Sequence, residues 1–122
     1  MQRECLACGM PVTVHRLQLE DLPPRQICLK CDSDVYAQSG GSCLTRDIAH
    51  HHETVTKAMQ KLESALVDAW QGTFRTLRLV VGGGLIRNEV LGQLRHYQQR
   101  GYLLDFSEES PNRGAILVRL RN

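Results

Sequence analysis

Four of the five cysteines occur as two C-x-x-C pairs, Cys5 with Cys8 and Cys28 with Cys31. Two such pairs can supply the tetrahedral set of four thiolates that zinc prefers. Because four sulfur ligands leave no open coordination position, the pattern predicts one structural zinc ion and not a catalytic one. Gly9 follows the first pair directly, where a tight knuckle favours a residue that accepts a positive φ.

Two other interpretations of these cysteines are a disulfide framework and unpaired buried thiols. The N-terminus shows no secretory signal, so we expect a cytoplasmic protein, in which disulfides are rare. We therefore favour zinc. His15 lies between the pairs and is either an alternative ligand or a surface residue. Cys43 stands alone after a small, polar stretch at residues 37–42, and we expect it to be a small buried apolar residue.

A second candidate site is the run Gly82, Gly83 and Gly84, which separates an apolar stretch from an amphipathic one. Glycine amides at the start of a helix can bind an anion, helped by the helix dipole. Arg87 would stand in the first turn of that helix, where it can contact a phosphate. The lysine and Ser/Thr of a P-loop are missing. The alternative is a turn whose glycines only allow close packing against a neighbouring strand.

Three successive histidines, His50, His51 and His52, precede the first long amphipathic stretch. Neighbouring residues of a strand point to opposite faces, so this run alone does not predict a three-histidine metal site. One imidazole can act as a general base or acid toward a phosphate. We take His51 as the first candidate and His50 or His52 as the second. The alternative is one buried or functional histidine with two exposed neighbours.

The hydrophobic periodicity predicts the elements that must position these groups. Apolar residues at helical spacing predict helices over residues 53–72 and 85–101. Strands are predicted over residues 44–49, 75–81, 102–106 and 115–121, with a turn at residues 107–114 joining the last two. The order β-α-β-α-β-β indicates a small two-layer α/β domain with both helices on one sheet.

The chain is therefore expected to contain two parts, a zinc ribbon with its linker at residues 1–42 and the α/β domain at residues 43–122. Between the cysteine pairs, alternating apolar residues and Pro23-Pro24 predict a short hairpin. No apolar run approaches the ~20 residues that span a bilayer, so we expect no membrane association.

Three stretches of the second part resemble the Smr (small MutS-related) family: "HHHETVTKAMQKLE", "LRLVVGGGLIRNEVLGQL" and "GAILVRL". The resemblance places His51 on the family's motif histidine, Gly82 and Gly84 on its turn glycines, and Arg87 on its helix-start arginine. His52 departs from a family glycine. Val81 stands where many members have a second histidine. Because Smr domains bind or cleave DNA or RNA, the resemblance implies contact with nucleic acid.

Arginine outnumbers lysine by twelve to three, and residues 74–122 carry eight arginines against four carboxylates, a net charge of +4. The planar guanidinium suits bidentate contact with phosphate. Phosphate contacts are expected from Arg75, Arg78, Arg87, Arg95, Arg113, Arg119 and Arg121, and among these Arg78, Arg87 and Arg113 join the glycine turn as the principal nucleic-acid-binding residues. A zinc–tetrathiolate centre would make the ribbon the acidic end, which favours protein contact there.

The sequence thus favours a protein that binds DNA or RNA, with a structural zinc ion and with endonuclease activity as an open question. The alternative is a non-enzymatic, zinc-dependent adaptor that contacts protein partners or the ribosome. A metal-dependent hydrolase of small phosphoesters is a third hypothesis, which rests on the histidine run alone.

Overall fold

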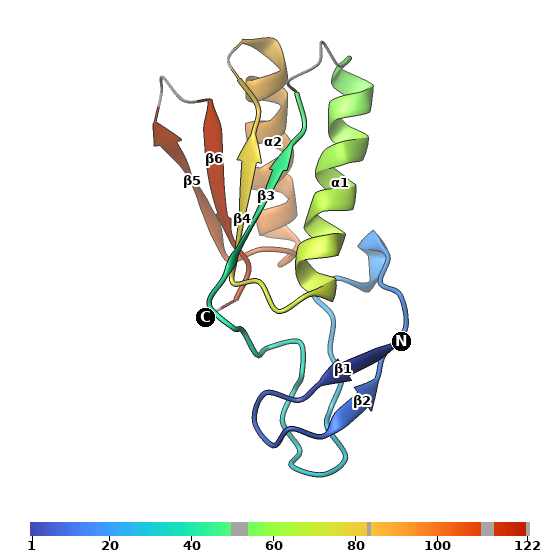
Figure 1. The fold of residues 1–122 in the computed structure, drawn as a ribbon. Coiled ribbons are helices and arrows are strands. Elements are labelled where there is room, and N and C mark those ends of the chain that lie inside the picture. Colours follow the sequence, from blue (N-terminus) through green and yellow to red (C-terminus); the bar gives the residue numbers. More distant parts are fainter. Residues whose placement is uncertain (50–53, 83, 111–113, 122) are drawn as a thin grey trace.

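The computed structural model describes residues 1–49, 54–82, 84–110 and 114–121 (Figure 1). The elements in chain order are β1 (Gln2–Glu4), β2 (Pro11–Thr13), the 3-10 helix η1 (Leu19–Asp21), β3 (Cys43–Asp47), α1 (Val55–Gln71), β4 (Thr76–Val80), α2 (Leu85–Gln99), β5 (Asp105–Ser110) and β6 (Ala115–Arg119). From β3 onward the order is β-α-β-α-β-β, which confirms the predicted fold class.

The four later strands form one mixed sheet in the order β3-β4-β6-β5. Strand β3 runs parallel to β4, with Leu44 opposite Leu77, whereas β6 is antiparallel to both β4 and β5. Figure 1 shows both helices on the same side of this sheet. The domain therefore has the two layers that the periodicity predicted.

The core lies between the helices and the sheet. Leu77 and Leu79 alternate with half-exposed residues along β4, so one face of that strand is buried beneath the helices. Leu62 and Leu66 of α1 cover the sheet at helical spacing. Trp70, at the end of α1, is buried, and its indole N–H donates to the carbonyl of Tyr102 at 2.8 Å. This bond satisfies the one polar atom of a large core side chain.

Thr54 starts helix α1. Its backbone is extended, and its Oγ1 accepts a hydrogen bond from the amide of Lys57 at 3.1 Å. Such a cap satisfies one of the amides that lack an intrahelical acceptor. Thr54 is therefore the N-cap, and Val55 is the first residue of the helix.

Residues 1–42, which we call the cysteine module, contain two small turns. Strands β1 and β2 pair around the first cysteine pair, and a single bridge between Ile27 and Asp34 flanks the second. The predicted hairpin between the pairs, turning at Pro23-Pro24, is wrong. Each C-x-x-C segment forms its own turn, so the chain between them runs through β2 and the short helix η1.

The cysteine module packs against the α/β domain. Its buried residues Val14, Leu17, Leu22, Val35 and Tyr36 belong to the same apolar cluster as the core of the domain. Residues 37–42, expected to be a linker, are held by the amide of Gly40, which donates to the carbonyl of Thr73 at 3.0 Å. The shared core gives the module apolar burial that its own short sequence could not provide.

Two buried arginines join the module to the end of α1. Arg3 and Arg121 are 8% and 4% exposed. Arg3 donates to the carbonyls of Val35, Gln71 and Gly72, and Arg121 to those of Tyr36, Ala69, Gly72 and Phe74, at 2.6 to 3.1 Å. The last carbonyls of a helix lack intrahelical donors, and the helix dipole favours cations there. These contacts therefore fix the module at the C-terminal end of α1.

Two sequence expectations need correction here. The strand predicted over residues 102–106 is instead β5, Asp105–Ser110, because Leu103 is buried and the Tyr102 carbonyl is bonded to Trp70, so these two residues lead into the sheet. Cys43, expected to be buried, is exposed at the start of β3. In the described part of the chain, neither helix has the length and hydropathy that spanning a membrane requires.

Candidate metal centre and nucleic-acid interface

Cys5, Cys8, Cys28 and Cys31 form a cluster in which all four Sγ atoms lie within 4.8 Å of one another. Two of the separations are 3.6 Å (Cys5–Cys31) and 3.7 Å (Cys8–Cys28). Four ligands at ~2.3 Å from a tetrahedral zinc would lie about 3.8 Å apart. Since a disulfide requires about 2.05 Å, the disulfide interpretation is wrong. The four cysteines together fit one tetrahedral metal ion.

Both cysteine pairs have the same knuckle geometry. The amide of Gly9 donates to the carbonyl of Cys5 at 2.7 Å, and the amide of Asp32 donates to the carbonyl of Cys28 at 2.8 Å. Gly9 has φ +77°, which confirms the expected positive φ, and Asp32 has φ +63°. Aspartate is one of the few residues other than glycine that tolerate a positive φ. Because no glycine follows the second pair, the sequence alone did not indicate that it forms the same turn.

The thiols of this cluster affect one another. A hydrogen bond from Gln38, 3.3 Å from Sγ, lowers the pKa of Cys5 to about 6 against the opposing effect of burial. A backbone hydrogen bond from Met10 favours the Cys8 thiolate, but burial and the neighbouring sulfurs outweigh it and raise the pKa of Cys8 to about 11. Several thiolates at this spacing need a cation to offset their repulsion. His15, which pairs with Asp21 at 3.5 Å, lies outside the cluster.

The second site forms at one edge of the four-stranded sheet. Because β3 and β4 are parallel neighbours, their carboxyl ends meet there, with Asp47 opposite Val80. The amide of Ile48 extends this pairing by donating to the carbonyl of Val80 at 3.0 Å. The β5–β6 connection leaves the sheet at the same edge, since Ala115 lies opposite both Val80 and Ser110. The two strand-to-helix junctions therefore start side by side (Figure 1).

Several predicted site residues lie outside the described residues. They are His50, His51, His52, Gly83 and Arg113. The residues that flank them are described and lie at this edge. Ala49 and Gly82 follow strands β3 and β4, Thr54 and Gly84 are the N-caps of α1 and α2, and Gly114 precedes β6. The histidine run and the glycine run therefore follow two strands that are paired with each other.

The two described glycines of the turn have left-handed backbones, with φ +65° at Gly82 and +85° at Gly84. A Cβ at either position would meet nothing within 4 Å, so close packing of a side chain does not explain these two glycines. Gly114 is different, because its Cβ would lie 2.6 Å from the Cα of Gly82. Its carbonyl accepts from the amides of Val81 and Gly82 at 2.7 and 3.0 Å. The close approach therefore occurs at Gly114, which the sequence analysis marked only as a turn residue.

Helix α2 begins at the same edge. Gly84 occupies its N-cap and has no side chain to satisfy the first amides of the helix, and the neighbouring Leu85 is exposed. The first amides of a helix have no intrahelical acceptor and carry its positive dipole end. An anion at this edge would therefore meet the first backbone donors of α2.

Four of the seven arginines expected to contact phosphate have partners within the protein. The Arg87 guanidinium lies 2.8 Å from Glu108, and Arg78 donates to Glu109 at 2.6 and 3.2 Å, which raises the pKa of Arg78. Arg119 pairs with Asp105 at 2.5 Å. The expectation for Arg121 is wrong, because its side chain is buried among carbonyls. Burial lowers the pKa of Arg121 to about 10, so it still carries its charge at neutral pH.

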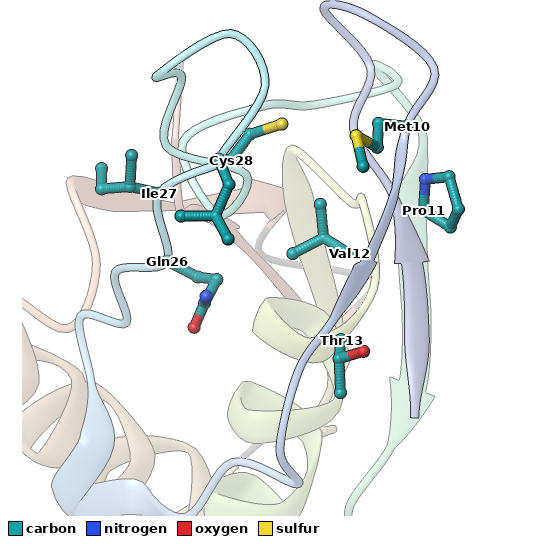
Figure 2. Close-up of a pocket in the computed structure, with 8 residues that line it drawn as sticks. Met10, Pro11, Val12, Thr13, Gln26, Ile27 and Cys28 are labelled. Atoms are coloured by element: carbon teal, nitrogen blue, oxygen red, sulfur yellow. The ribbon is translucent and has the colours of Figure 1, made fainter.

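The cysteine module has an apolar groove that the sequence did not reveal (Figure 2). Its volume is about 240 Å³, and its walls are Met10, Pro11, Val12, Thr13, Gln26, Ile27, Cys28 and Leu29. Leu6 and Leu29 occupy the second position of their respective C-x-x-C pairs and are 47% and 95% exposed. The sequence offered one signal for these exposed leucines, because leucine follows the first cysteine of both pairs. A large apolar side chain at the tip of such a turn cannot be buried in the core.

Comparison with solved structures finds a fold similar to the crystal structure of the Smr domain of Thermus thermophilus MutS2. The TM-score is 0.54 and the identity 26%, over 65% of this chain and 99% of that domain. This protein has an Smr-like fold. No protein-family model matches the chain, and no curated protein matches it.

The Smr-like fold gives Val81 a defined place. Val81 is 1% exposed and follows β4 directly into the glycine turn. In this chain, the position where the resemblance led us to look for a histidine is thus filled by a core residue. Any imidazole that serves this edge would have to come from residues 50–52.

Proposed function

We propose that this Smr-like protein binds DNA or RNA at the sheet edge formed by residues 82–84, the start of α2 and the neighbouring junction at residues 49–54. The observation that carries the proposal is the parallel pairing of β3 with β4, because it brings the two junctions to one edge. Ligands of open α/β sheets bind beyond the carboxyl ends of the strands. The likeness to an Smr domain supports the same assignment.

The chemistry of this edge suits a phosphate group. No side chain covers the turn at Gly82 and Gly84, and the first turn of α2 supplies backbone donors and the positive end of its dipole. Arg87 stands in that turn and Arg78 on β4. Arg113, between β5 and β6, is the third proposed basic contact.

The test is a titration of fluorescently labelled single- and double-stranded DNA and RNA, followed by anisotropy at two salt concentrations. Leu85, exposed at the first position of α2, provides the matched variants Leu85→Glu and Leu85→Gln. A carboxylate there favours the helix but repels phosphate, so Leu85→Glu should weaken binding about tenfold while Leu85→Gln changes it little. Absence of binding by the parent protein at low salt would remove the proposal.

For cleavage we propose His51 as the group that moves the proton, with His50 or His52 second. The assay measures cleavage of the same labelled nucleic acids by the His51→Ala variant. The matched control is His96→Ala, because His96 is exposed on helix α2. Cleavage that persists unchanged in His51→Ala would rule out that imidazole as the catalytic group. We assign the zinc ion a structural role only, because four cysteines fill its coordination.

A second candidate function is a protein adaptor, favoured by the exposed Met10 and Leu29, which line the groove of the cysteine module. Exposed apolar side chains grouped around a groove are typical of protein contact sites. A protein that co-purifies after nuclease treatment, and that is lost with Leu29→Ser, would favour the adaptor over nucleic-acid binding. Loss of all partners on nuclease treatment would favour nucleic-acid binding.

A further inference from the structure

Strand β5 carries three carboxylates, and each pairs with an arginine from a different element. Asp105 pairs with Arg119 of β6, Glu108 with Arg87 of α2, and Glu109 with Arg78 of β4. Arg87 and Arg78, two of the arginines proposed to contact phosphate, are therefore already matched by one acidic strand. The net charge of the sequence did not reveal this, because it counts charges without their partners.

The pairs differ in where they stand along β5. Glu108 and Glu109 lie near its carboxyl end, two residues and one residue before Ser110, which faces Ala115 at the edge of the glycine turn. Asp105 starts the strand and faces Arg119 at the opposite end of the sheet. The arginines that serve the proposed site are thus held by Glu108 and Glu109, whereas the third pair lies away from it.

The two pairs near the edge are also the better shielded. The side chain of Arg87 is 12% exposed, and Arg78 and Glu109 are less exposed than either member of the Arg119–Asp105 pair. Arg78 uses two nitrogens on the two carboxylate oxygens of Glu109. A phosphate offers a guanidinium the same bidentate arrangement of oxygens. A nucleic-acid phosphate and these carboxylates would therefore compete for the same N–H donors.

We propose that Glu108 and Glu109 form an autoinhibitory contact, in which they occupy Arg87 and Arg78 until nucleic-acid phosphates displace them. This inference rests on the proposed function. Strand β5 suits such an exchange, because it is an edge strand of the sheet and its pairing with β6 shifts register between Glu108 and Ser110. An edge strand is hydrogen-bonded to only one neighbouring strand, and a register shift can change the direction of its side chains. Glu108 and Glu109 could therefore move without the loss of two rows of backbone hydrogen bonds.

The experiment compares Glu108→Gln and Glu109→Gln with Asp105→Asn in the zinc-loaded full chain. All three remove one negative charge from β5, so Asp105→Asn controls for the change in net charge. Labelled single-stranded DNA and RNA are titrated by anisotropy at several salt concentrations. We expect Glu108→Gln and Glu109→Gln each to lower Kd about fivefold and to steepen the salt dependence by roughly one counterion. Asp105→Asn should change Kd less than about twofold, since its arginine lies away from the site.

The outcomes separate the two proposals. If the parent binds but Glu108→Gln and Glu109→Gln bind no more tightly than Asp105→Asn, the autoinhibitory contact is overturned and nucleic-acid binding stands. Weaker binding by these variants also overturns it, because the carboxylates would then be positioning the arginines for contact. If neither the parent nor any variant binds, nucleic-acid binding itself fails. A parent that binds only at low salt, with glutamine variants that still bind at higher salt, supports both proposals.

A second measurement uses the parent protein, so its result does not depend on whether the substituted variants fold. In ¹⁵N-arginine spectra of the parent protein, the Nε–Hε signals of Arg78 and Arg87 should shift when single-stranded DNA or RNA is added, as their partner changes from carboxylate to phosphate. The Arg119 signal should remain in place. Signals of Arg78 and Arg87 that do not move when the nucleic acid is bound would overturn the exchange.

Discussion

Arg3 and Arg121, from opposite ends of the sequence, donate to the same carbonyl oxygen, that of Gly72, at 2.8 and 2.9 Å. Each guanidinium also lies over an aromatic ring, Arg3 over Tyr36 at 4.8 Å and Arg121 over Trp70 at 4.7 Å. Two like charges can share one acceptor here because the end of α1 presents several unsatisfied carbonyls and a negative dipole. The attachment of the cysteine module therefore depends on both ends of the chain.

We expect Arg121→Ala to destabilise the protein by about 3 kcal/mol or more, because it leaves buried carbonyls without donors. Urea denaturation followed by circular dichroism measures this change. Arg119→Ala is the matched control, since Arg119 is exposed and two positions away, and it should have a far smaller effect. Equal stability of the two variants would contradict the structural role of Arg121.

Gly114→Ala should cost at least about 2 kcal/mol of stability, because its Cβ would collide with the backbone of Gly82 and its φ is +62°. Gly92, an exposed residue inside α2 with open space around it, is the matched control. There alanine should stabilise the helix by ~1 kcal/mol. Thermal unfolding of both variants gives the comparison, and the prediction fails if the two shifts have the same sign.

Removal of the metal should unfold the cysteine module and lower the thermal midpoint of the whole chain, because part of the common core comes from the module. Metal analysis of the purified protein should find one zinc ion per chain. Cys28→Ser should lose that stoichiometry, whereas Cys43→Ser, outside the cluster, should keep it. Full zinc content in Cys28→Ser would contradict the four-cysteine site.

Thr54→Ala should destabilise the protein by ~1 kcal/mol, because the amide of Lys57 loses its acceptor at the start of α1. Thr56, which is exposed in the first turn of α1, is the matched control. Its replacement by alanine should stay within about 0.5 kcal/mol of the parent. Chemical denaturation resolves a difference of this size, and similar costs at both threonines would exclude the capping role.

Much of the α/β domain could be predicted because its signals are local. Apolar residues at helical spacing located both long helices, and alternation located β4. The cysteine spacing also sufficed, since two C-x-x-C pairs leave few arrangements other than the observed cluster. The parallel pairing of β3 with β4 is typical of two neighbouring strands joined by a crossover helix, but the order of the elements alone left open whether these strands are neighbours.

What the sequence could not provide are partners that lie far apart along the chain. Arg121 has the same side chain as Arg119, and only the tertiary fold decides that one is buried among carbonyls and the other is exposed. Strand β5 was placed too early because "SEES" has a composition typical of turns. Its glutamates enter a strand because arginines from β4 and α2 lie within reach.

Helix α1 runs the whole way from the proposed nucleic-acid edge to the cysteine module (Figure 1). With 17 residues at about 1.5 Å each, it acts as a spacer of roughly 25 Å. Two ligands bound at opposite poles of the molecule would be kept apart by this fixed length and would not compete for room. The architecture would thus permit both proposed sites to be occupied at once, and a pair of fluorophores at the two poles would report a constant separation.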